Sequence, residues 1–159
     1  SLEIIEKSAH DLTTNLSDLV WALKPKEESF EKLLERIEQY GMELSAARNI
    51  SFVVSRNGLV VIKELSIDMC HQVYLFVKEA INNAVKYSDG SLIELLVKEE
   101  GEMLEFSIRD NGRGFDITTI KNGNGIGTMS KRAADLEGKF FLDSKINQGT
   151  LVSIRCKIT

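Results

Sequence analysis

The sequence predicts an α+β fold: a two-layer domain in which a mixed sheet carries helices on one face, preceded by a long helix. Three observations support this prediction. Residues 2–23 repeat apolar side chains with a heptad period, residues 67–87 have the periodicity of a half-buried helix, and the segments 91–99 and 102–110 alternate like two consecutive strands. Consecutive strands joined by a short turn pair antiparallel, so we expect a largely antiparallel or mixed sheet with helices on one face.

The composition is that of a folded domain and limits the possible partners. Of the 159 residues, 43% are hydrophobic and 28% are charged, with a net charge of −4. This charge and the lack of a Lys/Arg cluster argue against nucleic acid as the main partner. No apolar run approaches the roughly 18 residues of a membrane span, and no signal peptide is visible. Cys70 and Cys156 are interpreted as reduced core thiols, which predicts a cytoplasmic setting.

The first expected element is a helix with a narrow apolar seam. Its side chains follow one another at alternating spacings of three and four: Leu2, Ile5, Ala9, Leu12, Leu16, Leu19 and Leu23. Such a helix could pack on its own domain, but a narrow seam is more typical of a coiled coil or four-helix bundle formed between two chains. Pro25 ends this helix near Lys24. Because the helical pattern begins at the second residue, we expect the chain to be part of a longer protein.

The segments after Pro25 are predicted as alternating helices and strands. Ser29 is expected to cap a helix whose buried face consists of Phe30, Leu33, Leu34, Ile37, Tyr40, Gly41 and Leu44. The elements expected after it are a strand at 50–55, a turn with a strand edge within 57–66, a helix at 67–87, a hairpin at 91–99 and 102–110, a loop at 111–125, a helix at 126–137 that ends at Gly138, and two final strands joined by a turn around Asn147 and Gly149.

Glycine concentrates in two places within the later half of the chain. One is "DNGRGF", with Gly112 and Gly114, and the other is "NGNGIGT" at 122–128, which leads directly into a helix. Backbone N–H groups of a glycine-rich loop at a helix N-terminus bind phosphate well. The spacing of these glycines fits neither a P-loop nor a dinucleotide-binding fingerprint. Alone, the second cluster is equally compatible with a plain loop.

The helix at 67–87 carries a polar face whose side chains could bind a ligand. Glu79, Asn83 and Lys86 are spaced by four and three, which places a carboxylate, a carboxamide and an ammonium on one side of the helix. Mg²⁺ takes one or two protein oxygens and keeps its other positions for phosphate and water. The face could therefore hold a metal ion and a phosphate, although a solvated polar face is the simpler alternative.

Three stretches in this order resemble a known catalytic domain. "EAINNAVKYS", "IRDNGRGF" and "GNGIGTMSKRAADLEG" are similar to the N, G1 and G2 boxes of the ATP-binding domain of sensor histidine kinases, in the superfamily of gyrase, Hsp90 and MutL ATPases. The short segment between Phe115 and Gly123 resembles the short-lid branch. "LSDLVWALKP" resembles the end of the second dimerisation helix. The resemblance implies a Bergerat-type fold, with residues 1–25 as the C-terminal helix of a dimerisation and phosphotransfer bundle and residues 26–159 as the catalytic domain.

The resemblance also implies roles for individual residues. Asn83 matches the Mg²⁺ ligand, Glu79 matches the acid that acts as general base or orients the phospho-acceptor, and Lys86 matches a phosphate-contacting position. Asp110 matches the aspartate that accepts a hydrogen bond from the adenine amino group; a carboxylate only accepts, so it rejects the carbonyl of guanine. The remaining nucleotide-binding positions are Gly112 and Gly114 beside the purine, Gly123, Gly125, Ile126 and Gly127 in the lid, and Thr150 near the adenine end.

The expected activity is transfer of the ATP γ-phosphate, with Mg²⁺, to a histidine upstream of Ser1, for relay to a response regulator. The resemblance implies a homodimer through the N-terminal helix and a place in the cytosolic part of a membrane-associated receptor. His10 falls at an outward heptad position and is interpreted as structural. The alternatives are a nucleotide-binding regulatory module without chemistry of its own, and a serine kinase similar to anti-sigma factors. The heptad helix and "VWALKP" favour the histidine kinase.

Overall fold

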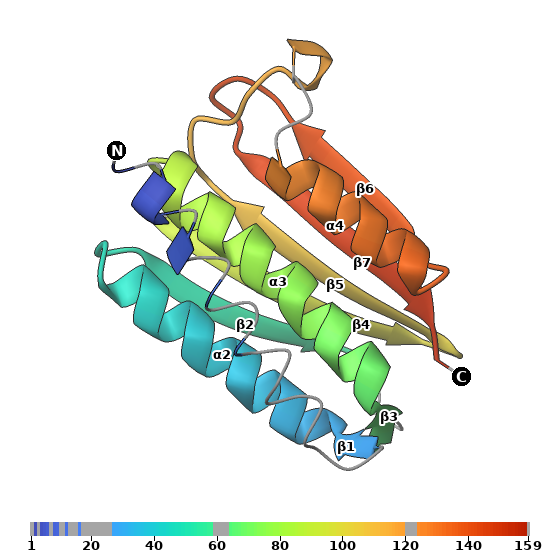
Figure 1. The fold of residues 1–159 in the computed structure, drawn as a ribbon. Helices are drawn as coiled ribbons and strands as arrows, with labels where there is room; N and C mark the ends of the chain where they lie inside the picture. Colours follow the sequence, from blue (N-terminus) through green and yellow to red (C-terminus); the bar gives the residue numbers. More distant parts are fainter. Residues whose placement is uncertain are drawn as a thin grey trace.

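The computed structural model describes residues 27–58, 64–119 and 124–158, together with eight helical residues between 2 and 16. Its elements are β1 (Glu27–Ser29), α2 (Phe30–Ala46), β2 (Ser51–Asn57), β3 (Glu64–Ser66), α3 (Ile67–Tyr87), β4 (Leu92–Glu100), β5 (Met103–Asp110), η1 (Ile117–Thr119), α4 (Asn124–Asp135), β6 (Lys139–Ser144) and β7 (Thr150–Lys157). The helices α2, α3 and α4 form one layer and a sheet forms the other (Figure 1). The predicted fold class is therefore confirmed.

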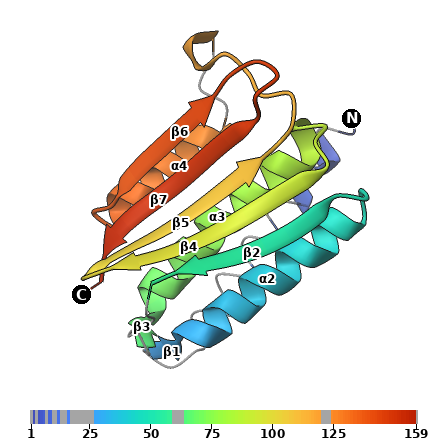
Figure 2. The ribbon, with the colours of Figure 1, turned by 180° about the vertical axis from the view of Figure 1, so that it is seen from behind.

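The main sheet is mixed, as predicted. It has five strands in the order β2-β4-β5-β7-β6. The β2–β4 pair is parallel, because the chain crosses over the sheet through α3 between these two strands. The other three pairs are antiparallel. Figure 2 shows the face of this sheet over which no described helix lies.

The core lies between the sheet and the three helices. Its largest fully buried side chains include Phe30 from α2, Phe76 from α3 and Phe106 from β5, so the helix layer and the sheet both contribute to it. Phe30 packs edge-on against Phe106 with ring centroids 6.4 Å apart, and Phe76 packs against Phe140 at 6.0 Å. Burial of each such ring stabilises the fold by about 1.5–3 kcal/mol. This packing fixes α3 against the middle of the sheet.

Helices α2 and α3 differ in how their N-termini are capped. Ser29 precedes α2, as predicted, but its side chain makes no capping hydrogen bond. Instead Ser29 belongs to β1, which pairs antiparallel with β3 in a small two-stranded sheet that the sequence did not predict. Ser66, at the end of β3, does cap α3: its Oγ accepts from the N–H of Met69 at 3.2 Å. This small sheet therefore ties together the beginnings of α2 and α3.

Two other predicted elements differ from the expectation or lie largely outside the described residues. Helix α4 begins at Asn124, two residues before its predicted start. Of the predicted seam of the N-terminal helix, Leu2, Ile5, Leu12 and Leu16 are described as helical and exposed, whereas Leu19 and Leu23 lie outside the described residues, as do Pro25 and His10. Within the described part of the chain, no helix is both long and apolar enough to cross a membrane.

Candidate functional site

The candidate site lies at the end of the sheet where β5 ends and β7 begins. The C-terminal end of α3, the segment after β5 and the turn between β6 and β7 all reach this end of the molecule (Figure 1). Asp110, Thr150 and Ser144 are paired partners across three adjacent strands, so they form one polar row. Since Phe106 and Ile108 on the same strand are buried under the helices, the alternation of β5 directs Asp110 to the helix layer.

Among the described residues, only neutral donors hold the buried carboxylate of Asp110. Its side chain is 6% exposed. The backbone N–H of Gly112 donates to Oδ1 at 2.9 Å, and the backbone N–H of Thr150 also bonds to the carboxyl group. Burial raises the pKa of Asp110, and these two N–H groups offset part of that rise. No cation in the described part of the chain pairs with it. A buried acid without a counter-ion costs stability, which points to a function.

The segment that follows Asp110 is fastened to its surroundings by side chains. Asn111 Oδ1 accepts from the backbone N–H groups of Ser91 at 2.9 Å and Leu92 at 3.0 Å, at the start of β4. Arg113 Nε donates to the backbone carbonyl of Tyr87 at 2.9 Å, at the end of α3. We did not predict these roles, because each contact joins residues about twenty or more positions apart. They fix the loop before any ligand is present.

The glycines of this loop are required by the protein's own packing. A Cβ on Gly112 would lie 2.1 Å from the carbonyl oxygen of Ser88. Gly114 has φ +56°, and its Cβ would lie 2.0 Å from the carbonyl oxygen of Lys145. In contrast, a Cβ on Gly127 would meet no described atom within 4 Å. The predicted approach of Gly112 and Gly114 to a purine therefore stays a prediction, with a structural reason for both glycines beside it.

The predicted polar face of α3 adjoins the buried face of the same helix. Its neighbours Val77, Ala80, Ile81 and Ala84 are buried, as the periodicity predicted. Glu79 and Asn83 are half-buried and Lys86 is exposed. No hydrogen bond or ion pair to other described residues engages these three side chains. The structure places them on α3, whose end adjoins Asp110 through Ser88 and Gly112, and it shows no direct contact between them and Asp110.

Glu79 lies near an aromatic cluster at the boundary between α2 and α3. The ammonium of Lys78 lies 5.4 Å from the ring centroid of Tyr40, and this ring packs edge-on against Tyr74 at 6.5 Å. Burial raises the pKa of Tyr40 to about 12, with smaller contributions from Tyr74 and the charge of Glu79. Tyr40 therefore stays neutral at physiological pH, and the half-buried Lys78 is held beside Glu79.

The lid positions are only partly described. Gly123 lies outside the described residues. Gly125, Ile126 and Gly127 are in the first turn of α4, which begins at Asn124. The backbone N–H groups of this turn lack partners within the helix, as in any first turn, and such groups attract anions. The structure thus places three of the four predicted lid positions at a helix N-terminus.

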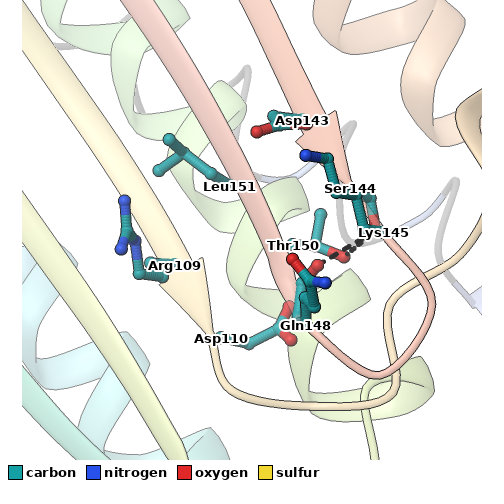
Figure 3. Close-up of a pocket in the computed structure, with 9 residues that line it drawn as sticks. Arg109, Asp110, Asp143, Ser144, Lys145, Gln148, Thr150 and Leu151 are labelled. Atoms are coloured by element: carbon teal, nitrogen blue, oxygen red, sulfur yellow. Dashed lines mark hydrogen bonds between the residues drawn. The ribbon is translucent and has the colours of Figure 1, made fainter.

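A cavity of about 150 Å³ opens beside the polar row (Figure 3). It is lined by Arg109, Asp110, Asp143, Ser144, Lys145, Gln148, Gly149, Thr150 and Leu151. Three of these, Arg109, Leu151 and Asp143, are paired neighbours that alternate with the row of Asp110, so they belong to the helix-free face. The cavity therefore opens partly on the helix-free face, and it shares Asp110 and Thr150 with the predicted nucleotide position.

Comparison with known proteins assigns the family. Residues 70–159, more than half of the chain, match the family described as histidine kinase-, DNA gyrase B- and HSP90-like ATPases. The chain belongs to this family. The matched residues contain every predicted site residue from Glu79 to Thr150, so the resemblance is confirmed at the level of the family, while the roles of single residues stay predictions.

One relative of the chain is a sensor kinase. Sensor histidine kinase YhcY of Bacillus subtilis (strain 168) is 27% identical over 157 residues, which cover 97% of the chain and 39% of that relative. The chain thus spans well under half of the relative's length.

Solved structures of histidine kinases share the fold of this chain. The catalytic domain of histidine kinase ThkA superimposes with a TM-score of 0.70 at 14% identity, covering 86% of this chain and 99% of that domain. Histidine kinase AdeS of Acinetobacter baumannii gives 0.69 at 14% identity, covering 99% and 80%. The histidine kinase domain of the blue-light activated kinase EL346 of Erythrobacter litoralis gives 0.67 at 16% identity, covering 79% and 61%.

Proposed function

We propose that this ATPase-family chain is the ATP-binding catalytic portion of a two-component sensor histidine kinase. It would transfer the γ-phosphate of ATP to a histidine located upstream of Ser1, and the phosphoryl group would pass to an aspartate of a response regulator. The observation that carries the proposal is the buried carboxylate of Asp110, which has no cationic partner in the described part of the chain. The named relative, a sensor histidine kinase, supports the choice within the family.

Asp110 would select adenine over guanine. Its carboxylate accepts a hydrogen bond from the exocyclic amino group of adenine and repels the carbonyl oxygen that guanine carries at the same position. Thr150 lies beside it on the neighbouring strand. Gly112 and Gly114 form the adjacent backbone, already closely packed on Ser88 and Lys145. This end of the site would therefore recognise the base without a large rearrangement.

The phosphate end would be formed by α3 and the start of α4. The carboxamide oxygen of Asn83 is the proposed Mg²⁺ ligand. The described residues contain no group of three or more His, Cys, Asp or Glu side chains that could hold a metal alone. A partial ligand set suits Mg²⁺ bound chiefly by a triphosphate. When bound, the ion would neutralise charge on the phosphates. The exposed Lys86 and the N–H groups around Gly123, Gly125, Ile126 and Gly127 would contact the phosphates.

Glu79 would act on the acceptor rather than on the nucleotide. Its carboxylate lies one helical turn before Asn83, on the same face of α3. There it would accept the proton of the acceptor imidazole, or orient that ring, as the nitrogen attacks in line with the leaving ADP. The aromatic cluster of Tyr40 and Tyr74 borders this position from α2.

Residues 1–25 would supply half of a dimerisation bundle, and residues 26–159 the catalytic domain. The exposed Leu2, Ile5, Leu12 and Leu16 support a partner helix, because four large apolar side chains along one seam are costly in water. The proposed assembly is a homodimer in the longer protein, on the cytoplasmic side of a membrane-associated receptor. Its proposed macromolecular partner is the response regulator.

Calorimetric titration with ATP, ADP and GTP in the presence and absence of Mg²⁺ tests nucleotide binding. We expect ATP and ADP to bind with Mg²⁺ and GTP to bind poorly. Equal affinities for ATP and GTP would remove the basis of the proposal. A regulatory module without chemistry would bind ATP in the same way, so binding alone does not distinguish it from a kinase.

A transfer assay with γ-labelled ATP separates the kinase from the alternatives. The protein extended upstream to include the other helix of the proposed dimerisation bundle should acquire phosphate that is labile in acid and stable in base, as phosphohistidine is. Glu79→Ala should slow this transfer with little effect on ATP affinity. Acid-stable phosphate would favour the serine kinase. Stoichiometric label on His10 of the present chain, lost in His10→Gln, would contradict an upstream acceptor.

A further inference from the structure

Ser144 occupies the outer end of the polar row and is 4% exposed. Three groups surround its hydroxyl oxygen. The backbone N–H of Phe115 donates to Oγ at 2.9 Å. The backbone carbonyl of Gly149 lies 3.1 Å away, and Oγ1 of Thr150 lies 2.8 Å away (Figure 3). We did not predict a role for Ser144 from the sequence, although it stands at an inward position after Phe140 and Leu142 on β6.

The three contacts can be satisfied together in only one arrangement of protons. The Phe115 N–H uses one lone pair of the Ser144 oxygen. The carbonyl of Gly149 only accepts, so it requires the single hydrogen of Ser144. The remaining 2.8 Å contact is then a hydrogen bond only if Thr150 donates its own hydrogen to the second lone pair of Ser144. The hydroxyl of Thr150 is left with lone pairs and no hydrogen for a ligand.

We propose that Ser144 is a positioning residue that makes Thr150 an acceptor, so that Asp110 and Thr150 together select a ligand edge bearing an amino group. This inference rests on the proposed nucleotide function and adds a specificity mechanism to it. Asp110 and Thr150 are paired across β5 and β7, and both face the helix layer. A free hydroxyl is indifferent, since it donates or accepts by rotation. A hydroxyl whose hydrogen is taken by Ser144 rejects a carbonyl, as a carboxylate does.

The test compares ATP with inosine triphosphate, which carries a carbonyl where adenosine carries the amino group. In Ser144→Ala, the hydrogen of Thr150 is released and becomes available to the ligand. We expect the preference for ATP over inosine triphosphate, measured as a ratio of Kd values with Mg²⁺ present, to fall by about tenfold, mainly because inosine triphosphate binds more tightly. An unchanged ratio would overturn the inference.

Two further variants separate proton direction from mere loss of structure. Thr150→Val removes the hydroxyl and creates no donor, so ATP should bind more weakly with no gain for inosine triphosphate. Thr150→Ser keeps the hydroxyl and should keep the preference. If Thr150→Val and Ser144→Ala change the two affinities in the same way, Ser144 does not act through the hydrogen of Thr150.

Ser153→Ala is the matched structural control. Ser153 is 6% exposed and its hydroxyl lies 2.8 Å from that of Ser107, so it is another buried hydroxyl pair between neighbouring strands, on the helix-free face. It should lose similar stability in urea and leave the nucleotide ratio unchanged; a change of the ratio in this control equal to that in Ser144→Ala would overturn the inference. If the unmutated chain binds neither nucleotide, the proposed function fails; if it prefers ATP and Ser144→Ala prefers it equally, only the role of Ser144 fails.

Discussion

Asp110→Asn should weaken ATP binding and leave the fold at least as stable as before. The substitution preserves the shape and replaces one carboxylate oxygen by an amino group. The backbone N–H groups of Gly112 and Thr150 both donate to the carboxyl group, Gly112 to Oδ1 at 2.9 Å, so the amide oxygen of the variant is expected to stay with these donors and its NH₂ group to face the ligand. The NH₂ group of the variant then faces the amino group of adenine, so two donors meet where the carboxylate accepted from that amino group. One such buried mismatch costs about 1–3 kcal/mol, which corresponds to a Kd increase of roughly 5- to 150-fold.

The effect on stability has the opposite direction. Burial raises the pKa of Asp110, so the folded protein holds this proton more tightly than the unfolded chain does. The free energy of unfolding therefore decreases as the pH rises from the ordinary pKa of an aspartate to the raised value, and at neutral pH the wild type retains the full cost. The neutral asparagine avoids this cost. The stability of the Asp110→Asn variant should therefore depend less on pH across the acidic range.

Calorimetry with ATP and inosine triphosphate tests the expected change in affinity, and urea unfolding at several pH values tests the expected change in stability. The amide should favour the carbonyl of inosine, so its affinity should rise as that of ATP falls. Asp143→Asn is the matched control, because Asp143 is an exposed acid on β6 that points to the helix-free face. If Asp110→Asn were destabilised at neutral pH in proportion to its loss of affinity, the weaker binding would reflect a distorted site, and the reasoning would be refuted.

Four other substitutions test separate parts of the structure. Gly112→Ala should lower the free energy of unfolding by about 1–3 kcal/mol, because its Cβ meets the Ser88 carbonyl. Gly127→Ala inside α4 should instead raise the free energy of unfolding by up to about 1 kcal/mol. Urea unfolding measures both changes, and equal effects of the two substitutions would contradict the packing argument. Asn83→Ala should weaken the Mg²⁺-dependent part of ATP affinity in calorimetry, and an unchanged affinity would make Asn83 a plain surface residue. Tyr40→Phe should reduce the loss of stability between about pH 10 and 12, since the pKa of Tyr40 rises from 10.0 to about 12 on folding and stability falls as the pH passes through that window; a stability curve that matches the wild type would argue against it.

The sequence predicted what depends on local periodicity and composition. The burial pattern of α3, the hairpin of β4 and β5, and the position of Asp110 at a strand end all follow from the spacing of side chains along one segment. Ser144 and Asn111 could not be found in this way. Ser144 meets the N–H of Phe115 across 29 positions, and Asn111 meets that of Ser91 across 20.

The two-stranded sheet of β1 and β3 was not predicted from the sequence for the same reason. Three residues are too few for a period to show, and their partner strand lies more than thirty positions away. Gly114 shows a different difficulty. Its glycine was attributed to the approach of a purine, and the structure adds the carbonyl of Lys145 as a sufficient cause. A glycine in a sequence indicates that something approaches closely, and only the fold identifies what it is.

The clamp formed by Arg113 has a consequence for protein engineering. Its side chain holds the last turn of α3 through Tyr87, its N–H donates to Ser88 at 2.7 Å, and its carbonyl accepts from the N–H of Asn147 at 2.6 Å. Three segments distant in the chain are thereby built as a single part. A chimaera that exchanges the loop at 110–115 alone would inherit mismatched neighbours. Transplanting 87–92, 110–115 and 144–150 together should carry the proposed base selectivity into another member of the family.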